Sequence, residues 1–239
     1  MFPTPLGRLK YFPLVDHIND SRLEFMLTIW GRSTSSNVQA LMWLVGELGL
    51  PYERHDVGHR YGGNDTPSFL KINPNGLVPV IRDGEESPLW ETGAILRHLA
   101  SRYSESSFWP KDEYARAIVD QWAEWSKIHI AMEFTGPIFW RVVRTAPSKR
   151  DNIALSAAIA RFDRSLDIAE AQLAQRRFLV SDDFTLADIQ FGHCLFRYYD
   201  IDIVRKKRPA LDRYYDDLQK RPAFRDHVVV SYEELRVLD

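Results

Sequence analysis

The 239-residue sequence predicts an α/β domain followed by an all-helical domain. In the first part of the chain, short apolar runs bounded by glycine and proline alternate with amphipathic helical patterns, in the order β-α-β-α-β-β-α. Residues 111–226 instead carry long helical patterns and no clear strand, and the pattern changes near 104–110. The expected segments are an N-terminal extension at 1–24, an α/β domain at 25–104 and a helical domain at 111–239.

The α/β domain is predicted to begin with a buried strand, the apolar run FMLTIW at 25–30, which Gly31 ends. Between residues 36 and 48, apolar side chains recur at helical spacing on a single stripe, so this segment predicts an amphipathic helix. Gly49 stops that helix, and PYERHDV at 51–57 predicts the second strand. The stripe consists of Val38, Leu41, Leu44, Val45 and Leu48.

The second half of this domain is predicted to continue with a glycine-rich loop at 58–67 and a short helix at 67–72, which begins with a favoured proline. The turn NPNG then leads to a predicted strand at 77–83, and a hairpin turn leads to another at 87–90. The pattern from 92 to 103 is helical again.

The helical domain carries two clear signals. Apolar residues from Leu155 to Leu173 alternate at spacings of four and three, which predicts a long helix. Thr185 is followed three positions later by Asp188, the aspartate form of a capping box, which predicts the start of another helix. The basic run RKKRP at 205–209 indicates a solvated helix end rather than a binding patch.

Composition and charge argue against several classes of protein. Hydrophobic residues make up 45% and charged residues 27%, as in an ordinary globular protein. The formal net charge of -2 gives no overall basic field for nucleic acid or anionic lipid. No apolar segment is long enough to span a membrane, and residues 1–24 lack a signal-peptide pattern. The single cysteine, Cys194, allows no intrachain disulfide or cysteine-rich zinc site, is expected to be inert packing, and fits a cytoplasmic location.

The segment RSTSSN at 32–37 gathers small polar side chains where the first strand ends and the first helix begins. The first N–H groups of a helix have no partner within it and favour an anion. One interpretation is that Ser35 and Ser36 simply cap the helix. The other is that these hydroxyls and Asn37 help to hold an anionic ligand at the helix start.

Two further places in the α/β domain bear on that choice. Val78–Pro79 puts a proline inside a strand pattern, where it marks an edge strand or, if the bond is cis, turns the main chain of Val78 toward an extended peptide. Glu91 and Thr92 lie where a strand enters a helix. They represent either favourable acidic placement at a helix start or a site for the amine and carboxylate of an amino-acid head group.

Together, these motifs resemble the glutathione S-transferase family. SSNVQALMWLVGELGLPYE, FLKINPNGLVPVIRDG and LWETGAILRHLASRY follow one another in the order and spacing of that family. FLVSDDFTLADIQF resembles the capped core helix of its helical domain, and RPAF at 221–224 resembles its closing helices. The resemblance covers residues 25–226 and implies a thioredoxin-like N-terminal domain, an all-helical C-terminal domain, a homodimer, and glutathione as co-substrate without a metal.

The resemblance also implies which residues bind glutathione. The main chain of Val78, beside a cis-Pro79 and next to Leu77, is expected to pair with the cysteinyl part. Glu91 and Thr92 are expected to hold the γ-glutamyl end, although the family commonly has serine where this chain has Thr92.

The remaining contacts implied by the resemblance come from a loop and from the helical domain. His59 and Arg60 lie where the family often supplies a cation for the glycyl carboxylate, and simple solvent exposure is the alternative. A hydrophobic electrophile is expected between the domains, near HIAMEFTGPIFWRVV at 129–143. The candidates there are His129, Phe134 and Trp140, and a plain helical core is the alternative for each.

Counting back from GLPYE places Ser35 where serine-type members of the family carry their activating hydroxyl. Asn37 is the helper or substitute, as in bacterial members resembling the Theta and Nu classes. Ser33, Thr34 and Ser36 compete for the same place. The loop contains neither tyrosine nor cysteine, which disfavours the tyrosine- and cysteine-type enzymes, and a thioredoxin-like redox pair is excluded.

The chemistry such a loop performs is thiol activation. A free thiol with a pKa of ~8.5 is only about 3% thiolate at pH 7, and the thiolate is the nucleophile. Hydroxyl or amide donors aimed at the sulfur favour the anion without a metal or a general base. The resemblance therefore implies a cytoplasmic glutathione transferase that attacks an electrophilic small molecule in detoxification. The alternatives are a glutathione-dependent disulfide or peroxide reductase, and a non-catalytic transferase-like regulatory or binding protein.

Overall fold

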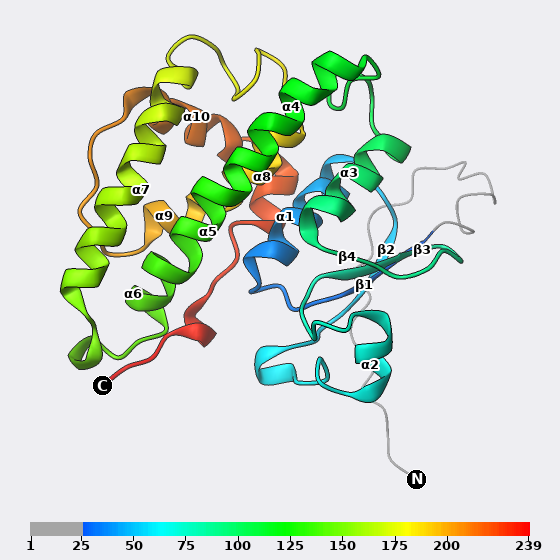
Figure 1. The fold of residues 1–239 in the computed structure, drawn as a ribbon, viewed down its shortest axis with the longest axis horizontal. Helices are drawn as coiled ribbons and strands as arrows, with labels where there is room; N and C mark the ends of the chain where they lie inside the picture. Colours follow the sequence, from blue (N-terminus) through cyan, green and yellow to red (C-terminus); the bar gives the residue numbers. More distant parts are fainter. Residues whose placement is uncertain (1–25) are drawn as a thin grey trace.

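The computed structural model describes residues 26–239, so the extension predicted at 1–24 and the first residue of the run at 25–30 lie outside the described part. An α/β domain comes first and a helical domain follows (Figure 1). The elements of the α/β domain are β1 (Leu27–Trp30), α1 (Ser36–Glu47), β2 (Tyr52–His55), the 3₁₀ turn η2 (His59–Tyr61), α2 (Pro67–Ile72), β3 (Val80–Asp83), β4 (Leu89–Trp90) and α3 (Thr92–Tyr103).

The sheet has four strands in the order β2-β1-β3-β4. β1 runs parallel to β2, and β3 runs antiparallel to both β1 and β4. This mixed sheet with its helices confirms the predicted thioredoxin-like domain. The third strand is shorter than predicted because it begins at Val80, directly after Pro79, which has no N–H to contribute to a ladder.

The helical domain starts with one continuous rod at 113–143 in which α-helical and π-helical segments alternate. Pro137 lies within the second π segment and cannot donate, so the regular i to i−4 ladder cannot pass through it. The elements of this domain are α4 (Glu113–Trp125), the π segment η3 (Ser126–Ala131), α5 (Met132–Phe134), the π segment η4 (Thr135–Trp140), α6 (Arg141–Val143), the 3₁₀ turn η5 (Pro147–Lys149), α7 (Asn152–Leu173), α8 (Leu186–Gly192), α9 (Leu195–Asp200), α10 (Pro209–Gln219), α11 (Pro222–His227) and the 3₁₀ turn η6 (Glu233–Leu235).

The predicted capping box stands at the start of α8. The fully buried Asp188 carboxylate accepts the backbone N–H of Thr185 at 2.8 Å and its hydroxyl at 3.0 Å. It also accepts the N–H of Leu179 at 2.9 Å and the hydroxyl of Tyr214 at 3.0 Å. The side chain of Asp188 thereby joins the start of α8 to α10 and to the loop that precedes α8.

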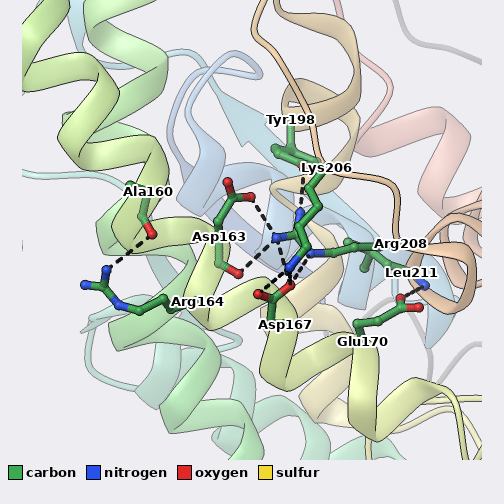
Figure 2. Close-up of polar contacts among 9 residues, drawn as sticks. All are labelled: Ala160, Asp163, Arg164, Asp167, Glu170, Tyr198, Lys206, Arg208 and Leu211. Carbon is green, nitrogen blue, oxygen red and sulfur yellow. Dashed lines mark hydrogen bonds and ion pairs between the residues drawn. The ribbon is translucent and has the colours of Figure 1, made fainter.

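The basic run at 205–209 differs from the prediction, because Arg208 is buried rather than solvated. Its guanidinium pairs with Asp163 at 2.7 Å and with Asp167 at 3.0 Å, both on α7, and Lys206 pairs with Asp167 at 2.8 Å (Figure 2). These charges join α7 to the segment before α10, so the run serves internal packing.

The two domains meet along α1, whose buried face packs against helices of the second domain. Trp43 contacts the rings of Phe184 and Phe224, with centroids 5.5 and 4.8 Å apart. A Cβ on Gly192 would lie 2.9 Å from the Trp43 ring and 2.6 Å from Leu218, so α8 approaches α1 closely there. This packing places the start of α1 beside the helical domain (Figure 1). Among the described residues, no helix is long and apolar enough to cross a membrane.

Candidate active site

The loop between β1 and α1 is held tightly at its first residue. The N–H of Gly31 donates to the carbonyl of His55 at 2.9 Å, and its own carbonyl accepts from Arg54 at 2.7 Å. A Cβ at Gly31 would lie 2.5 Å from Val38 and 3.3 Å from Val78. Only glycine fits there, and the close approach brings the segment before Pro79 next to this loop.

Ser35 is the N-cap residue of α1, yet its side chain makes no cap hydrogen bond. The residue is 9% exposed, so the hydroxyl lies at a largely buried helix start. The interpretation of Ser35 as a simple cap therefore fails, and its hydroxyl is left for another acceptor. Asn37 is exposed on the first turn of α1.

Thr34 is engaged elsewhere. Its hydroxyl donates to Oε1 of Glu234, in η6, at 2.5 Å, and its carbonyl accepts from Nη2 of Arg197, in α9, at 2.8 Å. Of the four hydroxyl groups at 33–36, this one is thus occupied by a carboxylate, which argues against it as a donor to sulfur. Ser33, Ser35 and Ser36 remain as the candidate hydroxyl donors.

The Val78–Pro79 peptide bond is cis, as the peptide-binding interpretation requires. Within residues 26–239, the N–H and C=O of Val78 have no hydrogen-bond partner. Leu77 is 63% exposed, and its carbonyl accepts from Asn73 at 2.8 Å. The segment therefore presents one unpaired main-chain residue beside the loop that begins at Gly31.

Glu91 lies between β4 and α3 with a φ of 70°, a conformation that non-glycine residues rarely adopt. Such a conformation costs on the order of 1–3 kcal/mol and is concentrated at functional sites. The Glu91 carboxylate is exposed and lies 3.8 Å from the ammonium of Lys127. Thr92, the first residue of α3, is 7% exposed. An exposed carboxylate next to a helix start suits the ammonium and the carboxylate of an amino-acid head group.

The loop at η2 carries His59 and Arg60, both exposed. His59 has a φ of 54°, the second non-glycine residue with positive φ in the described part of the chain. Nη2 of Arg60 donates to the hydroxyl of Tyr61 at 2.8 Å and pairs with Oε2 of Glu234 at 2.8 Å. Arg60 is therefore an anchored cation rather than a freely solvated one.

Two further arginines, Arg32 and Arg144, lie near the loop at η2. A Cβ at Gly58 would lie 3.3 Å from Nη1 of Arg32, so the guanidinium of Arg32 abuts the loop. Desolvation, reinforced by Arg144, lowers the pKa of Arg32. Desolvation, Arg32 and Arg144 likewise lower the pKa of His59, which is therefore neutral at pH 7. The region suits a carboxylate such as the glycyl end of glutathione.

The candidates for the second substrate lie on the rod at 113–143. The side chain of His129 is 45% exposed, with its ring 6.0 Å from that of Trp125 and its Nδ1 4.0 Å from Glu133. Trp140 is 47% exposed, and the guanidinium of Arg144 lies 4.9 Å above its ring. Both side chains offer surface to a ligand.

Phe134 differs from those two because it is only 1% exposed. Its ring packs against Phe139, Phe162 and Tyr198, so the structure places it in the core of the helical domain. Cys194 is buried as well, and desolvation raises the pKa of its thiol to about 12. The described residues contain no cluster of histidine, cysteine and carboxylate side chains that would hold a metal ion.

Two side chains at this site, Arg197 and Glu234, carried no signal in the sequence. Each contacts Thr34 from more than 160 positions away. The only hint is indirect, since Arg197 lies one turn and a half beyond the capped helix α8.

Comparison with known proteins identifies two matching family models. Residues 26–101 match "Glutathione S-transferase, N-terminal domain", and residues 152–217 match "Glutathione S-transferase, C-terminal domain". Glutathione S-transferase GstB of Escherichia coli is 35% identical over 206 residues, which is 86% of this chain and 99% of that protein.

Among solved structures, a theta class glutathione S-transferase from Xanthomonas axonopodis pv. citri, with glutathione bound, superposes with a TM-score of 0.81. It is 38% identical, and the alignment covers 86% of this chain and 98% of that one. The disulfide-bond oxidoreductase YghU of Escherichia coli is 30% identical over 66% of this chain, but the match spans only 54% of that relative.

Proposed function

Because the chain belongs to the glutathione S-transferase family and is a glutathione transferase, we propose that Ser35 and the start of α1 activate the thiol of glutathione. The observation that carries this assignment is the Ser35 hydroxyl, which lies at the N-cap but makes no cap hydrogen bond. One charge-assisted hydrogen bond contributes roughly 1.5–3 kcal/mol, and a helix terminus adds about 0.3–1 kcal/mol. Together these terms lower the pKa of a thiol by about two units.

Glutathione, the co-substrate, is proposed to lie along the segment before Pro79. The unpaired N–H and C=O of Val78 pair with its cysteinyl residue, and Leu77 lies alongside. Because a Cβ at Gly31 would lie 3.3 Å from Val78, a cysteinyl residue paired there has its sulfur near the start of α1. A theta class relative that is 38% identical was solved with glutathione bound, which supports glutathione as the ligand.

The two ends of the tripeptide meet groups of opposite charge. The ammonium of the γ-glutamyl end meets the Glu91 carboxylate, and its carboxylate meets Thr92 and the start of α3. The glycyl carboxylate meets Arg60, with His59 as a neutral hydrogen-bond donor. This arrangement fixes the direction of the peptide on the site.

The second substrate is proposed to be a hydrophobic electrophile attacked by the thiolate, as in detoxification. Trp140 and His129 provide partly exposed aromatic surface on the rod at 113–143 for such a molecule. Phe134 is left out because its ring packs in the core. The reductase and regulatory alternatives are not favoured, because the similarity to a named glutathione S-transferase spans 86% of the chain.

We further propose a cytoplasmic homodimer, which the family resemblance implies. Light scattering on the purified protein tests the assembly, and twice the 27.8 kDa chain mass is expected. A mass of one chain would contradict it.

The thiol-activation proposal is tested by the thiolate absorbance of bound glutathione as a function of pH. Ser35→Ala is expected to raise the pKa of the bound thiol by about 1–2 units, because a charge-assisted hydrogen bond is lost. Asn37→Ala is expected to raise it less, and Ser33→Ala and Ser36→Ala are the matched comparisons within the loop. A thiol pKa in Ser35→Ala equal to that of the unaltered enzyme would reject Ser35 as the donor.

A further inference from the structure

Glu234 connects the C-terminal segment to two separate loops of the site. Its carboxylate is largely buried, with 16% of the side chain exposed. Oε1 accepts a hydrogen bond from the hydroxyl of Thr34 at 2.5 Å, and Oε2 pairs with Nη2 of Arg60 at 2.8 Å. One partner directly precedes Ser35, and the other is the cation assigned to the glycyl carboxylate.

The segment that carries Glu234 is fixed on both sides. Before it, Tyr232 is 2% exposed, packs on the ring of Phe139 at 5.0 Å and donates its hydroxyl to Asp200 at 2.5 Å. After it, the N–H of Val237 donates to the carbonyl of Val143 at 2.9 Å. Figure 1 shows this segment, in red, passing the start of α1 and ending near α6. The position of the carboxylate is therefore set by the helical domain.

The side chain that Glu234 holds needs such an anchor. Arg60 lies on a loop flanked by Gly58 and Gly62, and 57% of its side chain is exposed. A long, exposed side chain on a glycine-rich loop loses rotamer freedom when it binds a ligand. An ion pair formed before the ligand arrives removes part of that cost.

The carboxylate is also surrounded by positive charge. Arg32 and Arg144 both act on His59, and Glu234 is the acidic group that opposes them there. Removing this carboxylate would leave the guanidinium groups of Arg32, Arg60 and Arg144 to repel one another. The loop at η2 would then lose its ion pair to the C-terminal segment.

We propose that Glu234 is a positioning residue for glutathione, which fixes Thr34 beside Ser35 through one oxygen and holds Arg60 ready for the glycyl carboxylate through the other. Glu234 acts through these two residues and does not touch the tripeptide. The inference rests on the proposed function, because it takes Ser35 and Arg60 as groups that contact glutathione.

The test measures the KM for glutathione, kcat, and the pKa of the bound thiol in four variants. Glu234→Ala is expected to raise the KM for glutathione about tenfold and to raise the thiol pKa, because both loops lose their anchor. Glu234→Gln keeps an acceptor for Thr34, so the thiol pKa stays near that of the unaltered enzyme while KM rises about threefold. Thr34→Val removes only the hydrogen bond from the Thr34 hydroxyl to Glu234 and keeps the ion pair with Arg60. This variant is expected to raise the pKa of the bound thiol with little change in the KM for glutathione.

Glu233→Ala is the matched control. Glu233 lies on the same turn and pairs with Arg236 at 2.7 Å on the exposed surface, so this variant is expected to leave KM and thiol pKa unchanged. An unchanged or lower KM in both Glu234 variants would overturn the inference, and Glu234→Gln decides the matter if the alanine variant fails to fold. The proposed function is tested separately, by the pKa of the bound thiol in Ser35→Ala measured under the same conditions.

Discussion

Arg197 of α9 donates a hydrogen bond from Nη2 to the carbonyl of Thr34 at 2.8 Å. Arg197 is 3% exposed, and its guanidinium lies 4.6 Å above the ring of Phe139. Desolvation lowers the pKa of Arg197 to about 10, so the group stays charged at pH 7. The helical domain therefore holds the loop before Ser35 with a buried cation, and the geometry of the loop depends on both domains.

Arg197→Met should therefore destabilise the protein. A hydrogen bond from a charged donor contributes about 1.5–3 kcal/mol, and the variant also leaves a buried carbonyl unpaired, so the free energy of unfolding should fall by about 3 kcal/mol. Urea unfolding measures this change. Arg164→Met is the control, because Arg164 is exposed and makes a single long contact to the carbonyl of Ala160 at 3.4 Å. Equal unfolding free energies for the two variants would show that the contact to Thr34 contributes nothing.

Asp188→Ala should cost more than a typical surface change, because it leaves four donors without their acceptor. Unsatisfied buried donors cost about 1–3 kcal/mol each before relaxation, so we expect a loss of about 3–4 kcal/mol in the free energy of unfolding. Asp188→Asn should lose less, because the amide oxygen still accepts. Asp183→Ala, an exposed aspartate in the same loop, should stay within about 0.5 kcal/mol of the unaltered protein. If Asp188→Ala also lowered the free energy of unfolding by no more than about 0.5 kcal/mol, this would contradict the role assigned to the capping box.

His193 should make stability depend on pH. Burial lowers its pKa from 6.5 to about 4, and its Nδ1 contacts the carbonyl of Ile189 at 3.2 Å. Between pH 6.5 and 4 the unfolded chain binds a proton that the folded chain does not, so stability falls as the pH falls through this window. From pH 7 to pH 5 this group alone should remove about 2 kcal/mol.

The measurement for His193 is the free energy of unfolding at pH 5 and pH 7 in the unaltered protein and in His193→Gln. Asp188 acts in the opposite sense, because burial raises its pKa to about 6 and its contribution falls as the pH rises from about 4 to 6. That contribution is common to both proteins and cancels in the difference between them. Identical pH dependence in the two proteins would show that the pKa of His193 is the same in the folded and unfolded states.

Local patterns in the sequence predicted most of the fold. The helices at 67–72 and 92–103 have the predicted bounds, because proline, glycine and apolar spacing mark both ends of each. The capping box at Thr185 and Asp188 was predictable for the same reason, since its two members are three residues apart. Signals of this kind need no knowledge of distant contacts.

Contacts between distant residues explain what the sequence could not predict. The carboxylate of Glu234 lies 200 positions from Thr34, and no periodic pattern connects them. Phe134 was a candidate for the pocket, but it lies between two π-helical segments. The sequence left a plain helical core as the alternative for Phe134, and its neighbours in that core, Phe162 and Tyr198, come from α7 and α9. Arg208 was expected in solvent for a similar reason, because its carboxylate partners come from α7.

Glu91→Gln should weaken glutathione binding more than turnover. The proposed partner of Glu91 is the ammonium of the γ-glutamyl end, which is far from the sulfur and is bound equally in the ground state and the transition state. The KM for glutathione should therefore rise about tenfold while kcat stays within about twofold.

Lys127→Met should instead lower the KM for glutathione, because the ammonium of Lys127, 3.8 Å from the Glu91 carboxylate, competes with the ammonium of glutathione for that carboxylate. Steady-state kinetics at varied glutathione concentration measures both, with Glu85→Gln, an exposed glutamate in the β3–β4 turn, as the control. A fall in kcat with constant KM in Glu91→Gln would place this carboxylate at the reacting sulfur instead.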